Sequence, residues 1–127
     1  MPRVPSYIST AAASSSDFNR GGLRESEHVM SYVMVARWRP REGATKQIET
    51  ILRELAAAIR QEPGNLHFTA LRGRDDANEI LLYEVYASEE VFREHQQTEH
   101  FKKLVLERAV PLLAVRERHA YSIADDI

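Results

Sequence analysis

Apolar residues between positions 28 and 123 recur with two periods, and the change from one period to the other marks the expected elements. Alternation at every second residue predicts strands at 28–38, 66–72, 79–87 and 115–123. In the first strand apolar and aromatic side chains occupy both faces, which is typical of a strand covered on two sides. The pattern therefore predicts a sheet with something packed on each face.

A helix is predicted after the first strand, beyond Pro40 and Gly43. Its apolar residues follow the spacing of one buried helical face: Ile48, Ile51, Leu52, Leu55 and Ile59. Pro63 cannot continue the helix, and Gly64 is expected to supply the left-handed residue of its cap. The sequence GRDDAN at 73–78 is dense in turn formers and predicts a hairpin between the second and third strands.

A second helical region is predicted between the third and fourth strands. Ser88 is a candidate N-cap, and Glu89 and Glu90 follow it where carboxylates favour the helix dipole. Thr98 predicts a second cap that breaks the region in two, and Pro111 marks its end. The order β-α-β-β-α-β predicts a ferredoxin-like α+β fold with one antiparallel sheet and helices on one face. A second copy of the chain is the simplest cover for the other face.

Residues 1–27 differ in composition from residues 28–127, which form the predicted domain. A small-residue tract at 11–16 and the pair Gly21-Gly22 predict an arm or linker, which we expect a partner subunit to hold. The chain of 127 residues is 43% hydrophobic, enough for one compact domain.

Charge and residue usage exclude several classes of function. A net charge of -2 gives no basic field to attract nucleic acid or an anionic membrane. No apolar run is long enough to span a bilayer, and no signal-peptide core is present. The lack of cysteine removes disulfides, thiolate nucleophiles and cysteine-based zinc sites, and fits a cytoplasmic location.

His95 is the strongest candidate for chemistry. It shares a predicted helical stripe with Phe92, so its imidazole is expected to point into a pocket, where it could remove a phenolic proton. The alternative is a wall histidine satisfied by one hydrogen bond. His100 is a second catalytic candidate, but it lies about 140° from His95 around an ideal helix. A structural bond at the helix junction is the alternative for His100. Because helical metal ligands favour spacings of three or four, no metal site is expected.

Five segments in register resemble the antibiotic biosynthesis monooxygenase domain family, over about residues 28–124. They are ARW at 36–38 leading to Gly43, EPG at 62–64, DDAN at 75–78, YEVY at 83–86, and His95 with His100-Phe101. The resemblance implies a dimeric α+β barrel with a pocket between sheet and helices. Family members include monooxygenases that oxidise quinol-like or dihydroxy-aromatic substrates without metal or flavin, and others that degrade haem, isomerise small sugar-derived signals or have no assigned reaction.

One position departs from the family pattern. Many members have tryptophan at the end of the third strand, where this chain has Tyr86. The haem-degrading branch relies on that tryptophan, an asparagine and a helix histidine. This chain offers His95 but has no asparagine in the first strand, which weakens the haem alternative.

The combined prediction is a homodimeric monooxygenase without a bound cofactor, acting on a quinol or polyhydroxy-aromatic molecule with dioxygen. His95 is the candidate general base, and Tyr86 is expected to bond a substrate oxygen or to lie at the dimer seam. The candidates for substrate contact are Tyr32, Met34, Phe68 and Phe92. Haem binding and a non-catalytic dimeric ligand-binding module remain the alternatives.

Overall fold

The computed structural model describes residues 31–127. The predicted arm at 1–27 and the start of the first predicted strand lie outside the described residues. Within residues 31–127, no helix has the length and apolar character needed to cross a bilayer.

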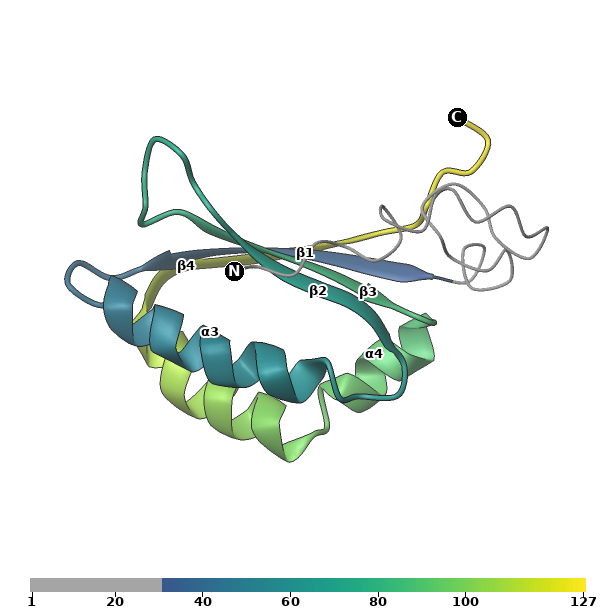
Figure 1. The fold of residues 1–127 in the computed structure, drawn as a ribbon, viewed down its shortest axis with the longest axis horizontal. Helices are drawn as coiled ribbons and strands as arrows, with labels where there is room; N and C mark the ends of the chain where they lie inside the picture. The colour runs from purple at the N-terminus through teal and green to yellow at the C-terminus, as the bar shows by residue number, and fades with distance from the viewer. Residues whose placement is uncertain (1–30) are drawn as a thin grey trace.

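The predicted order of elements is confirmed (Figure 1). The elements are β1 (Tyr32–Pro40), α3 (Thr45–Ile59), β2 (Asn65–Arg72), β3 (Ile80–Tyr86), α4 (Glu89–His95), the π-helix η1 (Phe101–Ala109), the 3-10 turn η2 (Val110–Leu112) and β4 (Leu113–Tyr121). Strand boundaries differ from the predicted ones by one to several residues; β4 begins and ends two residues earlier because its pairing with β1 fixes its limits. The fold is ferredoxin-like α+β, as expected.

The strands form one open antiparallel sheet in the order β2-β3-β1-β4. β1 lies at the centre, and Met34 faces Glu84 of β3 and Ala120 of β4 across the sheet. Figure 1 shows α3, α4 and η1 on the same side of the sheet. Side chains of even-numbered β1 and β3 residues therefore point toward the helices, and Glu84 and Tyr86 share this face as predicted.

The core lies between this sheet face and the helices. All five predicted core residues of α3 are buried, with at most 6% of their surface exposed: Ile48, Ile51, Leu52, Leu55 and Ile59. They pack with Trp38 and Phe68 from the sheet and with Phe101 and Val105 from η1. The alternating and helical apolar patterns thus meet in one continuous core.

Both predicted caps of the second helical region are present. The Ser88 hydroxyl accepts a hydrogen bond from the Val91 backbone N–H at 3.2 Å. The Thr98 hydroxyl accepts from the Phe101 N–H at 3.2 Å and donates to the His95 carbonyl at 2.7 Å. These two hydrogen bonds of Thr98 stabilise the break between α4 and η1. His95 therefore ends one helix, and His100 begins the next.

The predicted left-handed cap at Gly64 is wrong. Within residues 31–127, Gly43 is the glycine with positive φ, at 83°. Gly64 is needed for a different reason, because a Cβ atom there would overlap the side chain of Val91 in α4. The turn after α3 can approach α4 closely only when residue 64 has no side chain.

Candidate active site

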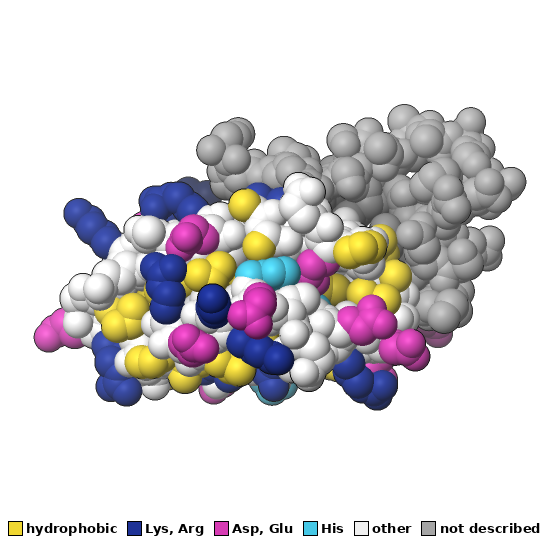
Figure 2. Space-filling view, turned by 90° about the horizontal axis from the view of Figure 1, so that it is seen from below, with side chains coloured by type: hydrophobic (Ala, Val, Ile, Leu, Met, Phe, Trp, Pro, Cys, Tyr) yellow, Lys and Arg dark blue, Asp and Glu magenta, His cyan; other side chains and the backbone are white. Residues whose placement is uncertain are grey.

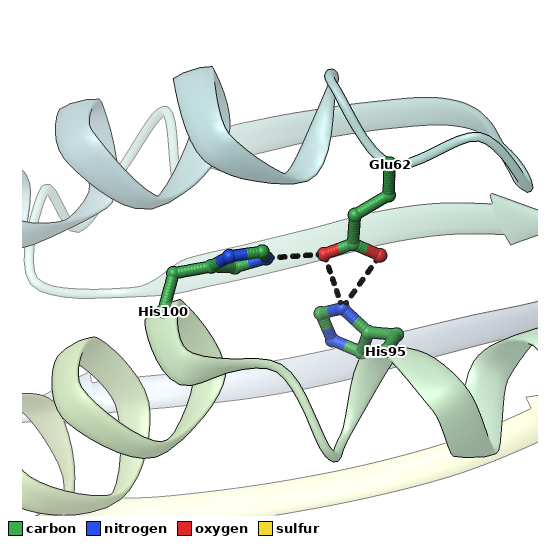
Figure 3. Close-up of side chains that lie close together, drawn as sticks. All are labelled: Glu62, His95 and His100. Carbon is green, nitrogen blue, oxygen red and sulfur yellow. Dashed lines mark hydrogen bonds and ion pairs between the residues drawn. The ribbon is translucent and has the colours of Figure 1, made fainter.

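Three residues from three segments converge between the turn after α3 on one side and α4 and η1 on the other (Figure 3). Glu62 lies in the turn that follows α3, within the sequence EPG. His95 is the last residue of α4, and His100 is the N-cap residue of η1. The turn at Gly64 brings Glu62 toward α4, and the break at Thr98 turns His100 back toward the same carboxylate.

The Glu62 carboxylate accepts hydrogen bonds from both imidazoles. His95 Nδ1 lies 2.9 Å from Oε2 and 3.1 Å from Oε1, and His100 Nε2 bonds to Oε2. The His95 side chain is 3% exposed, that of Glu62 10% and that of His100 24%. Because an ionised carboxylate only accepts, His95 Nδ1 and His100 Nε2 carry the protons.

The charge of Glu62 depends on these two bonds. Burial raises the pKa of its carboxyl, but the hydrogen bonds from His95 and His100 lower it by more, so the pKa lies below its ordinary value. Glu62 is therefore an ionised carboxylate at neutral pH. It fixes the His95 tautomer and can stabilise an imidazolium at that position.

The His95 ring is packed among aromatic side chains. Its centroid lies 5.1 Å from that of Tyr86, 5.6 Å from Phe92 and 5.0 Å from Phe101. With Nδ1 bonded to Glu62, the second nitrogen, Nε2, retains its lone pair in the neutral ring. None of the hydrogen bonds between described residues involves Nε2. The geometry gives His95 the form of an oriented general base.

Tyr86 and Glu84 form a second buried polar pair. Tyr86 is 0% exposed, and its hydroxyl donates to Glu84 Oε1 at 2.6 Å. Burial and the neighbouring Glu84 raise the pKa of the Tyr86 phenol. Burial also raises the pKa of Glu84, against the opposing effect of the Tyr86 hydrogen bond. The Tyr86 hydroxyl is thus hydrogen-bonded to Glu84, for which strand alternation predicted only a shared face with Tyr86.

A small cavity lies between the sheet and the helices. Its lining is Met34, Ala36, Trp38, Leu55, Ile59, Leu82, Glu84, Phe92, His95, Phe101, Val105, Arg116 and Arg118. About 20 Å³ is open to the centre of a water-sized sphere, which is room for roughly one water molecule. A ring-sized ligand enters this cavity only when lining side chains move apart.

The predicted substrate contacts divide into two groups. Met34 and Phe92 line the cavity. Phe68 belongs instead to the main core, and Tyr32 packs against Phe92 with ring centroids 5.2 Å apart. Figure 2 views the helical side of the protein, where a histidine side chain lies among hydrophobic and acidic neighbours.

Sequence reasoning missed three residues of this region. Glu62 was included in the EPG segment but assigned no role in the site, although a carboxylate beside a Pro-Gly turn is a visible signal. Arg116 and Arg118 alternate on β4 and contribute to the cavity wall, a position that strand periodicity alone did not reveal. The convergence of His95 and His100 was also unexpected, because the spacing on one helix argued against it.

Glu62, His95 and His100 are also a set of potential metal ligands. One ligand atom from each lies within 4.8 Å of the others. Two imidazoles and one carboxylate are the donors that iron(II) and zinc bind in many enzymes. Within residues 31–127, Glu62, His95 and His100 form the one group of three histidine, aspartate or glutamate side chains whose ligand atoms come close enough to share a metal ion.

An open antiparallel sheet, helices on one face and a partly buried histidine–carboxylate cluster define a small ferredoxin-like α+β protein with a polar site. The sequence model of the antibiotic biosynthesis monooxygenase family matches residues 31–105. The chain belongs to this family.

Solved structures share the fold at low sequence identity. A protein from Nitrosomonas europaea, described as a candidate antibiotic biosynthesis monooxygenase, is 24% identical over 72% of this chain and 88% of that one, with a TM-score of 0.69. PA3566 from Pseudomonas aeruginosa is also 24% identical, over 75% and 95%, with a TM-score of 0.69. A conserved protein from Methanosarcina mazei Go1 is 14% identical over 76% and 95%, with a TM-score of 0.71. Among proteins with curated functions, none matches this chain.

Proposed function

We propose that this protein is a monooxygenase that oxidises a quinol or related polyhydroxy-aromatic molecule without a bound cofactor. The observation that carries the proposal is the Glu62–His95 pair, in which Glu62 holds Nδ1 and leaves Nε2 with its lone pair beside an apolar cavity. Membership of the antibiotic biosynthesis monooxygenase family supports the reaction class.

In this mechanism His95 starts the reaction by removing a phenolic proton through Nε2. The ionised Glu62 stabilises the resulting imidazolium, as a carboxylate does for a catalytic histidine. The apolar wall formed by Met34 and Phe92 leaves the substrate anion poorly solvated and electron-rich. A phenolate in this state can pass electrons to dioxygen.

The oxidation then balances with dioxygen as the oxidant. The substrate anion transfers electrons to dioxygen one at a time, and a bond forms between a ring carbon and one oxygen. The His95 imidazolium protonates the outer oxygen of this peroxide. Loss of the C–H proton and cleavage of the O–O bond leave a carbonyl on the ring, and the outer oxygen departs as water. The substrate gives up four electrons, which dioxygen takes.

Tyr86 is assigned a supporting role in this proposal. Its hydroxyl is held by Glu84, and its ring packs against His95. Tyr86 therefore positions the base through packing, while Glu84, which lines the cavity, offers a polar contact for a substrate oxygen.

The proposed working form is a homodimer. Val33, Tyr83 and Val85 lie on the sheet face opposite the described helices, by the alternation of β1 and β3. A second copy that packs on this face would complete the two-sheet barrel that the family resemblance implies. Light scattering coupled to size exclusion would give twice the chain mass, and a monomer at micromolar concentration would contradict this assembly.

Oxygen uptake with a panel of hydroquinones and naphthohydroquinones tests the proposed reaction. We expect turnover that falls by about 10²–10⁴ in the His95→Ala variant, the usual contribution of a general base. The control is Gln47→Ala, because Gln47 is an exposed residue of α3 outside the cavity. Uptake that is absent across the panel, or equal in the two variants, would contradict the proposal. Saturable binding without turnover would instead indicate a ligand-binding module.

A second candidate function is a metal-dependent oxygenase, and the approach of Glu62, His95 and His100 favours it. Titration with Co²⁺ discriminates the two candidates, because a His₂Glu site produces visible absorption that the His100→Gln variant would lose. Activity that survives chelator treatment and the His100→Gln substitution supports the cofactor-free reaction. Haemin titration tests haem binding in the same way, through a shift of the Soret band.

A further inference from the structure

Arg116 and Arg118 lie side by side along the wall of the cavity. They alternate on β4, one of the two edge strands, where Arg116 pairs with Trp38 and Arg118 with Ala36 of β1. Even-numbered β1 residues face the helices, so the two arginines lie on that face as well. Both line the same cavity as His95 and Glu84.

Arg116 and Arg118 lack the carboxylate partner that several other arginines among residues 31–127 have. Arg37, Arg39 and Arg72 each form an ion pair with a carboxylate. Among residues 31–127, no carboxylate lies within ion-pair distance of Arg116 or Arg118. The Arg116 Nε–H is buried and has no hydrogen-bond partner. A buried guanidinium donor without an acceptor is costly, which points to an acceptor supplied from outside the chain.

The charges around Arg116 strengthen this conclusion. Burial lowers the pKa of Arg116, and the neighbouring charge of Arg118 lowers it further. The acidic side chain in the cavity lining is Glu84, whose Oε1 already accepts from Tyr86. Arg118 acts on Glu84 only through its field. An anion placed between the two arginines would both relieve their mutual repulsion and accept a hydrogen bond from the buried Arg116 Nε–H.

We propose that Arg116 and Arg118 bind a carboxylate carried by the aromatic substrate, so that the hydroxyl-bearing ring extends toward His95. A planar carboxylate matches the edge of a guanidinium group in a bidentate contact and adds little thickness to a planar ring. The inference rests on the proposed oxygenase function and narrows its substrate class to hydroxy-aromatic acids. The two long side chains at this wall are also the ones that can move to admit the ring.

Trp38 provides a direct measurement of binding. It is the single tryptophan of the chain and lines the cavity beside Arg116. Quenching of its fluorescence is measured with naphthol and with a hydroxynaphthoate that carries a carboxylate next to the same hydroxyl. We expect the hydroxynaphthoate to bind about tenfold more tightly or better, with an affinity that falls as salt rises.

Substitution of the arginines separates charge recognition from fold. In Arg116→Met and Arg118→Met the preference for the hydroxynaphthoate is expected to fall to about twofold or less, because the hydroxynaphthoate loses more affinity than naphthol. Arg74→Met, at an exposed arginine in the hairpin, is the matched control and is expected to keep the preference. Circular dichroism of each variant verifies that it is folded. If Arg116→Met does not fold, the test is made with Arg118→Met alone.

Three results would overturn the inference: equal affinity for the two compounds, equal weakening of both by Arg116→Met, or no quenching by either. Because binding is measured without turnover, these results are independent of oxygen uptake. A protein that prefers the hydroxynaphthoate but consumes no oxygen would leave the anion site standing and contradict the oxygenase function alone.

Discussion

Nδ1 of His95 lies 2.9 Å from Oε2 of Glu62, although the two residues are 33 positions apart in the chain. The contact joins the turn after α3 to the end of α4, and both atoms are almost enclosed by protein. A carboxylate in this position sets the tautomer of the imidazole and directs its basic nitrogen away from itself. The pair is therefore the structural basis for assigning His95 a chemical role.

Replacement of Glu62 by glutamine is expected to lower turnover by about 10- to 100-fold, as for other residues that orient a functional histidine. The amide keeps the size of the side chain but cannot stabilise an imidazolium by charge. Oxygen uptake under saturating substrate measures the effect on kcat. Glu49→Gln, at a carboxylate that pairs with Arg72 outside the cavity, is the control. Equal kcat in Glu62→Gln and the parent protein would show that Glu62 has no part in the chemistry.

We expect the Glu84→Gln variant to have a higher free energy of unfolding than the parent protein, by an amount that depends on pH. Burial raises the pKa of Glu84 above its ordinary value of 4.5, so the unfolded chain releases this proton first as pH rises. The contribution of Glu84 to the free energy of unfolding is therefore present below about pH 4.5 and is lost as pH rises toward the folded pKa.

Urea denaturation at several pH values measures this difference. Glu84→Gln is expected to be more stable than the parent at neutral pH, with the difference shrinking toward pH 4. A difference that is constant with pH, or that grows as pH falls, would rule out a buried carboxyl with a raised pKa.

Removal of the Tyr86 hydroxyl is expected to destabilise the protein. Tyr86→Phe leaves Glu84 Oε1 buried without its donor, at a cost of about 1–3 kcal/mol in the free energy of unfolding. In the double variant Tyr86→Phe with Glu84→Met both polar partners are gone, so the total loss should be smaller than the sum of the single losses. Strictly additive losses in thermal or urea unfolding would show that the two side chains do not interact.

Gly64→Ala is expected to cost about 1–3 kcal/mol, because the new methyl group overlaps Val91. Val91→Ala should recover part of this loss by making room. Gly43→Ala is the matched control: it has no neighbour within 4 Å, and its cost comes from the φ of 83°. Val91→Ala therefore should not rescue Gly43→Ala. Rescue of both variants, or of neither, in urea denaturation would contradict the packing explanation for Gly64.

Several elements of this fold were predictable because their signals are local. The apolar period of residues 48–59 placed all five core positions of α3 correctly, since a helix brings residues three and four apart onto one face. Ser88 and Thr98 were recognised as caps because a hydroxyl needs only the backbone of the next three residues. Alternation likewise placed Glu84 and Tyr86 on one face of β3.

The sequence by itself determined the order of elements, their buried faces and the choice of His95 as the leading candidate for a functional residue. Only the tertiary structure decided that His95 and His100 share Glu62, that Gly64 is required by Val91, and that Arg116 lines the cavity. The reason is physical: periodicity fixes which way a side chain faces within its own helix or strand. Which distant side chains then meet depends on turn geometry and on the packing of helices against the sheet, and these are set by non-local contacts.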